Sequence, residues 1–556
     1  MSERTDELKR LYRRFGSDTK ALLTEYPALD NLRVFSDRRE GLLEWFSFRK
    51  GASLLQAGSG AGSLTRMLLS KGLKVTVQEE DPELLEFVKL RLSGAEAAPE
   101  FFSGALGDIP AGRRFDYVLF DGTLKKNDFA AVAAAKHLLA EGGVLIAAAD
   151  NSYGVRAFAG AEREENSMSR EALEALLLQD GRSDGECASR TGGNTAECPS
   201  RAGGNGFLTR YYVEPMRALP SAIYSDRRLP EAGELSRVIP AYGFPAYLAI
   251  DIGAKYDEVC RDGVYPQFAD AFLFFWTAGK SGQTAGDTAP ADSAVFVKYN
   301  RNRREEYQLK TVIRETGAAG PGYTVEKSAL SDAGVPHIRD FEKRFRILCA
   351  EQERKPEAER VIYAEPYISE DGRTAVFPWI TGESFGAEVT KKILGGAPLK
   401  ETLEEAFRRV LPAEAGSASQ TRGAHNLDSI LDNFLLTEGT AGTTSAETGK
   451  TGTSSAETGK TRTSSAGRLS GIDYEWVTEQ PADRGFVKSA RSSLSMSRTG
   501  RCSPWEAVQN SCSSSALVRQ RPTASRRWKR SSSRRSQEMT SPSIWTASWW
   551  KSGTAA

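Results

Sequence analysis

The stretch SLLQAGSGAGS at residues 53–63 decides the fold, together with VTVQEED at residues 75–81. An apolar strand runs directly into a Gly-x-Gly-x-Gly loop, an amphipathic helix follows over residues 64–69, and a second strand ends in three acids. Glycines let a backbone approach a ligand closely, and a carboxylate after the second strand can accept hydrogen bonds from both ribose hydroxyls. The pattern predicts a βαβ unit that holds an adenosine-type ligand.

The chain continues in the same style after this unit. Helices are predicted over residues 82–92 and 129–140, and apolar strands over residues 115–120 and 144–148. Residues 1–50 are predicted to form helices that lead into the first strand. Strands that alternate with helices of this length predict an α/β fold, a Rossmann-like parallel sheet with helices on both faces.

Bulk composition excludes several classes of protein. The 556 residues suffice for more than one domain, and 74 basic against 73 acidic residues give no general attraction to nucleic acid or to a membrane surface. Six cysteines do not make a disulfide framework in so long a chain. The most apolar run, residues 268–276, is too short to span a bilayer. We therefore expect a cytoplasmic protein without stable membrane insertion.

Changes in composition divide the chain. ECASRTGGN at residues 186–194 recurs as ECPSRAGGN at residues 197–205, which predicts a duplicated, flexible insertion over about 181–205. A Gly/Ala/Thr/Asp-rich linker at residues 282–292 separates a first domain, residues 1–281, from a second, residues 293–488.

The tight Gly loop resembles that of the class I methyltransferases that use S-adenosylmethionine, and so does FDYVLFD at residues 115–121. The resemblance covers roughly residues 35–280. It implies that Gly58, Gly60 and Gly62 approach the methionine and ribose part of the cofactor, that Glu79 holds the ribose hydroxyls, and that Asp108 borders the adenine.

Two further positions follow from the same resemblance. Asp121 ends the fourth strand beside the methyl group and is the candidate base. Gln56 stands where the family usually has an acid, so it can accept a hydrogen bond but gives up a charge near the cationic donor. A dehydrogenase that binds NAD through the same loop remains an alternative, although its usual Gly-x-Gly-x-x-Gly motif would require glycine at Ser63.

Residues 142–161 resemble a bacterial subgroup often linked with surface-polysaccharide synthesis. That likeness implies a small-molecule or glycan acceptor, or a lipid- or nucleotide-linked precursor of a glycan. It would also make Asn151 and Tyr153 face the acceptor pocket.

The second domain carries the spacing of a kinase catalytic loop. In HNLDSILDN at residues 425–433, Asp428 precedes Asn433 by five positions, and Asp473 follows an apolar strand further along. In kinases such an Asp accepts the hydroxyl proton, and the Asn and the later Asp bind magnesium.

Upstream features extend this pattern. Lys298 ends the run VFVK and mirrors the strand lysine that grips phosphates, and Glu306 on a predicted helix over residues 303–315 could pair with it. The domain is similar to small-molecule kinases of the aminoglycoside and lipopolysaccharide-heptose type, a two-lobed α+β fold. The resemblance implies ATP and Mg²⁺, although no Gly-rich loop precedes Lys298.

The remaining segments are not expected to fold. A Thr/Ser/Gly/Lys repeat over about residues 439–468 has no apolar side chain larger than that of alanine and predicts disorder. The Ser- and Arg-rich residues 489–556 are either a disordered tail or the product of a reading-frame shift near Lys488. The departures at Gln56, in the insertion and in the tail keep open a third interpretation, a scaffold with degenerate catalytic halves.

Overall fold

The computed structural model describes most of the chain up to residue 483. The described residues are 2–95, 97–179, 206–237, 242–244, 247–278, 294–316, 322–410, 420–421, 425–426, 431–437, 468–475, 477–478 and 482–483. Several sequence predictions lie outside them, namely the insertion at 181–205, the linker at 282–292, the residue Asp428, the repeat at 439–467 and the tail at 489–556.

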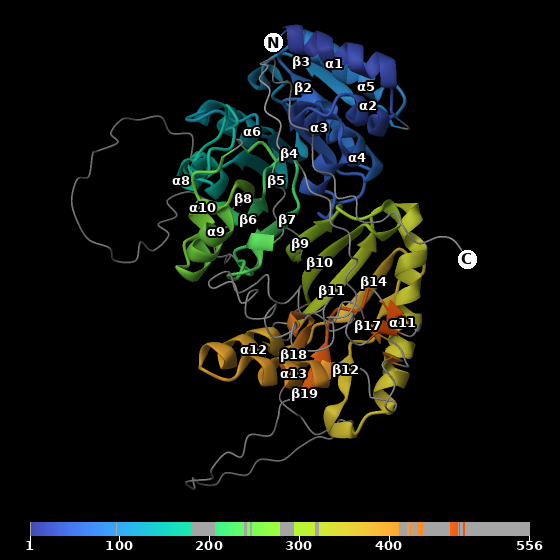
Figure 1. The fold of residues 1–556 in the computed structure, drawn as a ribbon. Coiled ribbons are helices and arrows are strands. Elements are labelled where there is room, and N and C mark those ends of the chain that lie inside the picture. The colour runs from blue at the N-terminus through green and yellow to red at the C-terminus, as the bar shows by residue number, and fades with distance from the viewer. Residues whose placement is uncertain are drawn as a thin grey trace, which may run out of the picture. The chain divides into compact units, whose positions relative to one another are not determined.

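Five parallel strands form the sheet that the Gly loop predicts (Figure 1). They are β1 (Ser53–Ala57), β2 (Lys74–Glu79), β3 (Glu100–Ser103), β4 (Phe115–Asp121) and β5 (Leu139–Asp150). Their order is β3-β2-β1-β4-β5. Strands β2 and β3 thus lie on one side of β1, and β4 and β5 lie on its other side, so the strand order switches between β1 and β4. Ligands of open parallel sheets bind at the carboxyl ends of the strands beside this switch point.

Antiparallel strands extend the sheet beyond β5. In spatial order they are β8 (Ala271–Ala278), β6 (Gly206–Glu214) and β7 (Ala222–Ser225). Strand β8 runs antiparallel to β5, and β6 antiparallel to β8. The result is a Rossmann-like α/β sheet, as the sequence predicts.

Helices cover both faces of the parallel strands. Leu55 and Val118 pack in one apolar cluster, whereas Leu54 and Leu119, one position away on the same strands, pack in another. Successive side chains of a strand point to opposite faces, so both faces are buried. The covering elements include the 3₁₀ helix η1 (Asp37–Leu42), α4 (Thr65–Ser70), α5 (Pro82–Leu92), α6 (Phe129–Leu138), α7 (Val155–Phe158), α8 (Arg170–Leu178), α9 (Ile252–Arg261) and α10 (Tyr265–Phe268). Outside them, α1 (Ser2–Phe15), α2 (Thr19–Glu25) and α3 (Leu29–Phe35) contribute to a further apolar cluster with α5.

The sheet does not end at β7. Strand β9 (Ala294–Asn300) pairs antiparallel with β7, and β10 (Leu309–Thr316), β11 (Gly322–Ala329), β14 (Thr374–Pro378) and β13 (Tyr367–Ile368) continue it to thirteen strands. Glu44, just after η1, accepts hydrogen bonds from Lys310 Nζ at 2.7 Å and Tyr299 Oη at 3.2 Å. The division into domains at residues 281 and 293 stays a prediction.

The helix predicted over residues 303–315 is wrong. Its first part contains a short 3₁₀ turn, η5 (Glu305–Tyr307), and the rest is β10, flanked by β9 and β11. The β-branched pair Val312 and Ile313 is buried in this strand. Pairing on both edges and burial of these side chains override the helical spacing of the charges.

A smaller four-stranded sheet follows, in the order β12 (Val361–Tyr363), β19 (Arg468–Gly471), β18 (Phe434–Thr437) and β15 (Glu383–Ser384). The helices α11 (Val335–Glu353), α12 (Phe385–Leu394) and α13 (Leu399–Val410) contribute to a third apolar cluster. The turn at Gly372, with φ +72°, joins β13 to β14.

The other short elements are η2 (Gly60–Gly62), η3 (Leu106–Asp108), η4 (Leu235–Arg237), η6 (Asp332–Gly334), η7 (Glu357–Glu359), η8 (Leu431–Asn433), β16 (Gln420–Thr421), β17 (His425–Asn426), β20 (Val477–Thr478) and β21 (Ala482–Asp483). Among the described residues, no helix has both the length and the apolar character needed to cross a bilayer.

Candidate functional site

The loop after β1 depends on its glycines. Gly58, Gly60 and Gly62 have φ values of +82°, +52° and +72°, a region that L side chains rarely adopt. A Cβ atom on Gly58 would lie 2.4 Å from Cγ2 of Thr123, whose hydroxyl donates to the carbonyl oxygen of Ala57 at 2.7 Å. The loop therefore bends tightly against the end of β4.

Gln56 braces this loop from beneath. Its fully buried amide donates from Nε2 to the carbonyl oxygen of Ser59 at 2.9 Å, and its Oε1 accepts from Thr65 Oγ1 at 2.8 Å. Both ends of the amide are thus used within the protein. A direct contact between Gln56 and the cofactor stays a prediction.

Glu79 ends β2 beside the loop. Its Oε2 accepts from the backbone N–H of Ser59 at 3.0 Å and from the Ser59 hydroxyl at 2.6 Å, and its Oε1 accepts from the N–H of Asp81 at 3.1 Å. A hydroxyl group already occupies one position that a ribose hydroxyl would take. The carboxylate is therefore positioned at the loop, as predicted, and its role toward ribose stays a prediction.

Asp108 lies at the same edge of the sheet, after β3. It ends η3, its side chain is exposed, and its Oδ2 accepts from the N–H of Ala105 at 3.0 Å. The structure thus brings the Gly loop, Glu79 and Asp108 to the carboxyl ends of three neighbouring strands. Contact of Asp108 with adenine stays a prediction.

Asp121 is buried between two arginines. Its Oδ2 accepts from Arg39 Nη2 at 2.6 Å and Nε at 3.1 Å, and its Oδ1 accepts from Arg217 Nη1 at 2.5 Å. Burial alone would raise the pKa of Asp121, but the charges and hydrogen bonds of the two guanidinium groups outweigh it and hold this pKa below its ordinary value. These contacts do not suit a general base, so that role of Asp121 stays an unsupported prediction.

Arg217 connects Asp121 to the end of β5. Its backbone N–H and its Nε donate to the two carboxylate oxygens of Asp150, at 3.0 and 3.1 Å. Gly122, with φ +72°, makes room for this side chain, because a Cβ there would lie 2.3 Å from Cζ of Arg217. Sequence reasoning missed Arg39 and Arg217, since isolated arginines far from the loop carry no motif.

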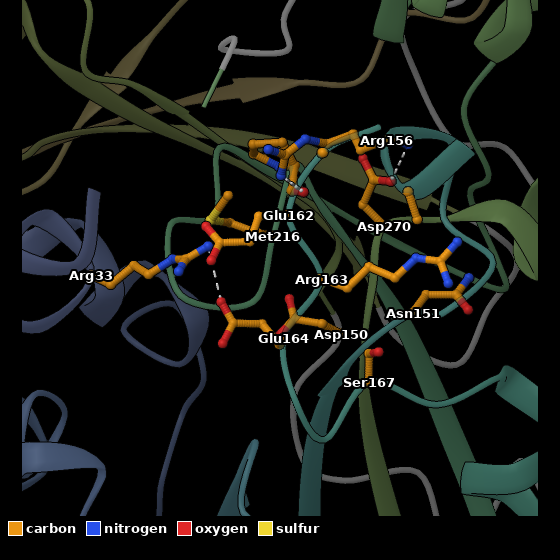
Figure 2. A pocket seen from close by; sticks show the side chains of 13 residues that line it. Arg33, Asp150, Asn151, Arg156, Glu162, Arg163, Glu164, Ser167, Met216 and Asp270 are labelled. Carbon is orange, nitrogen blue, oxygen red and sulfur yellow. Dashed lines mark hydrogen bonds and ion pairs between the residues drawn. The ribbon is translucent and has the colours of Figure 1, made fainter. Parts of the chain in front are cut away.

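A small cavity opens beside Asp150 (Figure 2). Its volume is about 40 Å³, and it is lined by Arg33, Asp150, Asn151, Arg156, Ala157, Ala161, Glu162, Arg163, Glu164, Ser167, Pro215, Met216 and Asp270. Asn151 lines it, although its Nδ2 donates to two backbone carbonyls and its Oδ1 accepts from the N–H of Tyr153 at 2.9 Å, and its role toward an acceptor stays a prediction. Tyr153, by contrast, is 57% exposed and is not among the lining residues.

A buried acid pair lies at the wall of this cavity. Asp270 Oδ1 accepts from the N–H of Arg156 at 3.0 Å, and Glu214 Oε1 accepts from Tyr265 Oη at 2.9 Å. Tyr256 Oη is hydrogen-bonded to both carboxyl groups. Burial, with the charge of Asp270, raises the pKa of Glu214 well above its ordinary value, and burial raises the pKa of Asp270 to about 6.

The second half assembles a charged cluster around Lys327 on β11. Lys327 Nζ donates to Asp473 Oδ1 at 2.9 Å and to Glu475 Oε1 at 2.8 Å, and Arg303 also pairs with Glu475. The carbonyl oxygen of Asn433 accepts from the N–H of Ile472 at 2.9 Å, so the segments that carry Asn433 and Asp473 adjoin.

The expected pair of Lys298 and Glu306 is wrong. Glu306 lies on the 3₁₀ turn η5 and forms an ion pair with Arg304 at 2.8 Å. Lys298 lies on β9. Burial lowers its pKa, although the negative charge of Asp473 acts to raise it. Sequence reasoning missed Lys327, although the run TVEKSA at residues 324–329 gives it the same strand-lysine signal as Lys298. Phosphate binding by Lys298 stays a prediction.

No protein-family model matches the sequence, and the search of curated proteins found no significant match. Solved structures of similar fold include an S-adenosylmethionine-dependent methyltransferase from Thermotoga maritima, at 15% identity over 49% of this chain and 100% of that chain, with a TM-score of 0.26. The N-methyltransferase NodS from Bradyrhizobium japonicum, solved with S-adenosyl-L-homocysteine, matches at 18% identity over 21% and 63%, with a TM-score of 0.19.

A TehB-like methyltransferase from Corynebacterium glutamicum matches at 19% identity over 24% of this chain and 73% of that chain, with a TM-score of 0.19. The match covers less than half of the length of some other solved chains, and in two of them it covers 45%. We therefore rest the fold on the strand order and the function on the site itself.

Replacing Gly58 tests how tightly the loop is built. Gly58→Ala is expected to destabilise the protein by about 1–3 kcal/mol more than Gly51→Ala. Position 51 has a similar φ of +75° but nothing within 4 Å of an added Cβ, so the control carries the backbone strain without the clash against Thr123. Urea unfolding of both variants measures the difference, and equal destabilisation would show that the loop has room for a side chain.

Replacing Glu214 tests the buried acid pair. The ordinary pKa of Glu214 is 4.5, so between that pH and its higher folded pKa the folded protein holds a proton that the unfolded chain releases. The stability from this proton is present at low pH and is lost as pH rises. Glu214→Gln cannot ionise, so its melting temperature relative to the parent should rise from about pH 5 to about pH 8. Glu171→Gln on the exposed start of α8 should show no such trend.

Proposed function

We propose that the first half of the chain, residues 1–281, binds S-adenosylmethionine and transfers its methyl group to a polar acceptor. The observation that carries the proposal is the Gly loop held against Glu79. Three glycines with positive φ shape the loop at the ends of β1 and β4, and Glu79 already accepts a hydroxyl hydrogen bond there. A loop followed by a carboxylate in this arrangement suits an adenosyl ligand.

The residues present fit the cofactor. The loop over Gly58–Gly62 would approach its methionine and ribose part, Glu79 would accept from the ribose hydroxyls, and Asp108 would border the adenine. When bound, S-adenosylmethionine supplies an electrophilic methyl group on a positively charged sulfur. At this edge two acids pair with two arginines, so their charges cancel. The acids are Asp121 and Asp150, and the arginines are Arg39 and Arg217. That balance avoids an excess of positive charge that would repel the sulfonium.

The chain's own residues contribute alignment more than covalent chemistry. Methyl transfer is a displacement in line with the breaking bond, so most of the catalysis comes from holding donor and acceptor in position. Arg39 and Arg217 fix the end of β4 against η1 and the end of β5. For the acceptor we propose a surface glycan or its precursor, which the charged and polar lining of the cavity beside Asp150 supports.

Isothermal titration with S-adenosylhomocysteine tests this function. Glu79→Gln should weaken binding about tenfold or more, because a hydrogen bond to a charged acceptor contributes about 1.5–3 kcal/mol. Glu80→Gln is the matched control, since it removes the same charge from the neighbouring exposed side chain and should leave the affinity unchanged.

Two results would contradict the assignment. Binding of NAD but not of S-adenosylhomocysteine by the parent protein would favour the dehydrogenase alternative. Equal affinities of the parent and Glu79→Gln for S-adenosylhomocysteine would remove Glu79 from the site.

For the second half we infer a kinase-like site that takes ATP and Mg²⁺. The contact of Lys327 with Asp473 supports it, because a strand lysine beside a magnesium-binding Asp is the arrangement that phosphoryl transfer uses. Lys327 would hold phosphates, and Asn433 and Asp473 offer the oxygen ligands that Mg²⁺ prefers. Asp428, outside the described residues, would accept the proton of the phosphate acceptor.

Thermal shift with Mg²⁺ and ATP tests the second site. Lys327→Met should abolish stabilisation by MgATP, whereas Lys343→Met, on the exposed side of α11, should keep it. Because Lys327 is buried, each shift is measured against the melting temperature of the same variant without nucleotide. The absence of any MgATP shift in the parent would contradict nucleotide binding. Together with a failure to bind S-adenosylhomocysteine, it would favour the scaffold alternative.

A further inference from the structure

The cavity in Figure 2 is connected to the Gly loop by an unbroken series of contacts. Asp150, which lines the cavity, is bonded to Arg217, Arg217 to Asp121, and Asp121 to Arg39. A Cβ on Gly60 would lie 3.4 Å from Nη2 of Arg39 and 3.6 Å from Oδ2 of Asp121. The cavity therefore lies on the same edge as the loop, one side chain beyond the pair of arginines.

The acids around this edge differ in what already occupies their oxygens. Both carboxylate oxygens of Asp121 and of Asp150 accept from arginines. Both oxygens of Asp270 accept as well, from the N–H of Arg156 and from Tyr256 Oη.

Glu164 is different from these acids. Its Oε1 pairs with Arg33 Nη2 at 3.0 Å, and its side chain is 33% exposed. In the described part of the chain, no hydrogen bond or ion pair is recorded for its second oxygen, Oε2. Figure 2 shows Glu164 between Arg33 and Asp150, with the contact to Arg33 dashed. Glu164 is thus a partly buried lining acid with room for a new hydrogen bond, whereas Glu162, which lines the same cavity, is exposed.

We propose that the cavity receives a hydroxyl group of the methyl acceptor and that Glu164 takes the proton of that hydroxyl. The inference rests on the methyltransferase function proposed above. The acceptor oxygen forms a bond to the methyl carbon as the bond from that carbon to sulfur breaks, with its electron pair kept by sulfur, while the hydroxyl proton passes to a carboxylate oxygen of Glu164. Charge balances, because the positive donor and the negative carboxylate both become neutral.

The charged surroundings of Glu164 suit this task. Burial and the negative charge of Asp150 raise its pKa, while the positive charges of Arg33, Arg217 and Arg39 oppose the rise. Two more charged side chains, Glu162 and Arg163, line the same cavity. A carboxylate with a raised pKa is a stronger base than an ordinary one.

The position of Glu164 can be tested without knowing the acceptor. S-adenosylmethionine carries a positive sulfur, and S-adenosylhomocysteine does not. If Glu164 lies beside the transferred methyl group, the sulfonium lowers its pKa, so binding of S-adenosylmethionine releases more protons than binding of S-adenosylhomocysteine, by up to about one proton per site. Calorimetric titration of the full chain in buffers of different ionisation enthalpy, from about pH 5 to about pH 8, counts these protons.

Three variants make the result specific. Glu164→Gln should bring the difference in proton release to zero, whereas Glu162→Gln, an exposed acid of the same cavity wall, should keep it. Arg33→Gln removes the partner of Oε1, so the difference should persist with its maximum at a higher pH.

The outcomes separate the two proposals. If the parent binds neither ligand, the methyltransferase function fails. If both ligands bind but release equal numbers of protons, or if the difference survives in Glu164→Gln, the role of Glu164 is overturned while the methyltransferase function stands.

Discussion

The geometry of the first half depends on one buried interaction, the carboxylate of Asp121 between Arg39 and Arg217. Asp121 is only 3% exposed, and an unpaired carboxylate at that depth would cost several kcal/mol. The two arginines come from η1 and from the segment after β6, about 80 and 100 positions away along the chain. The carboxylate therefore fixes three distant segments at the carboxyl edge of the sheet.

This interaction also decides how the chemistry is divided. An acid held by two guanidinium groups is a weak base, so Asp121 contributes charge balance and position. In the methyl transfer that we propose, the proton passes instead to Glu164 at the cavity beside Asp150, whose carboxylate has a single arginine partner among the residues that the structure describes. The Gly loop completes the edge, because Gly60 lies beside the same arginine and carboxylate.

Local physics explains which parts could be predicted from the sequence. Helix α5 begins at Pro82 because Asp81 caps it by accepting from the N–H groups of Glu83 and Leu84, and Pro is favoured in the first turn. The apolar runs of β1 and β4 and the glycines between β1 and α4 are equally local signals. They were sufficient for the fold class, the loop and the position of Glu79.

The remainder arises from contacts between segments far apart in the sequence. Residues 309–316 have charges at helical spacing, and only the strands on both sides make them β10. Arg39, Arg217 and Lys327 belong to no motif whose spacing reveals their partners, since each acquires its role from an acid brought close by the fold. The acid pair Glu214 and Asp270 is likewise defined only by burial.

A crystal structure of the full chain with bound S-adenosylhomocysteine tests the central claim most directly. The account predicts the ligand along the carboxyl ends of β1 and β2, with its ribose hydroxyls on Glu79 in place of the Ser59 hydroxyl and its sulfur toward Asp121 and the cavity that contains Glu164. A ligand bound elsewhere, or bound at the loop with Glu79 still held by the Ser59 hydroxyl and without contact to the ribose, would contradict it.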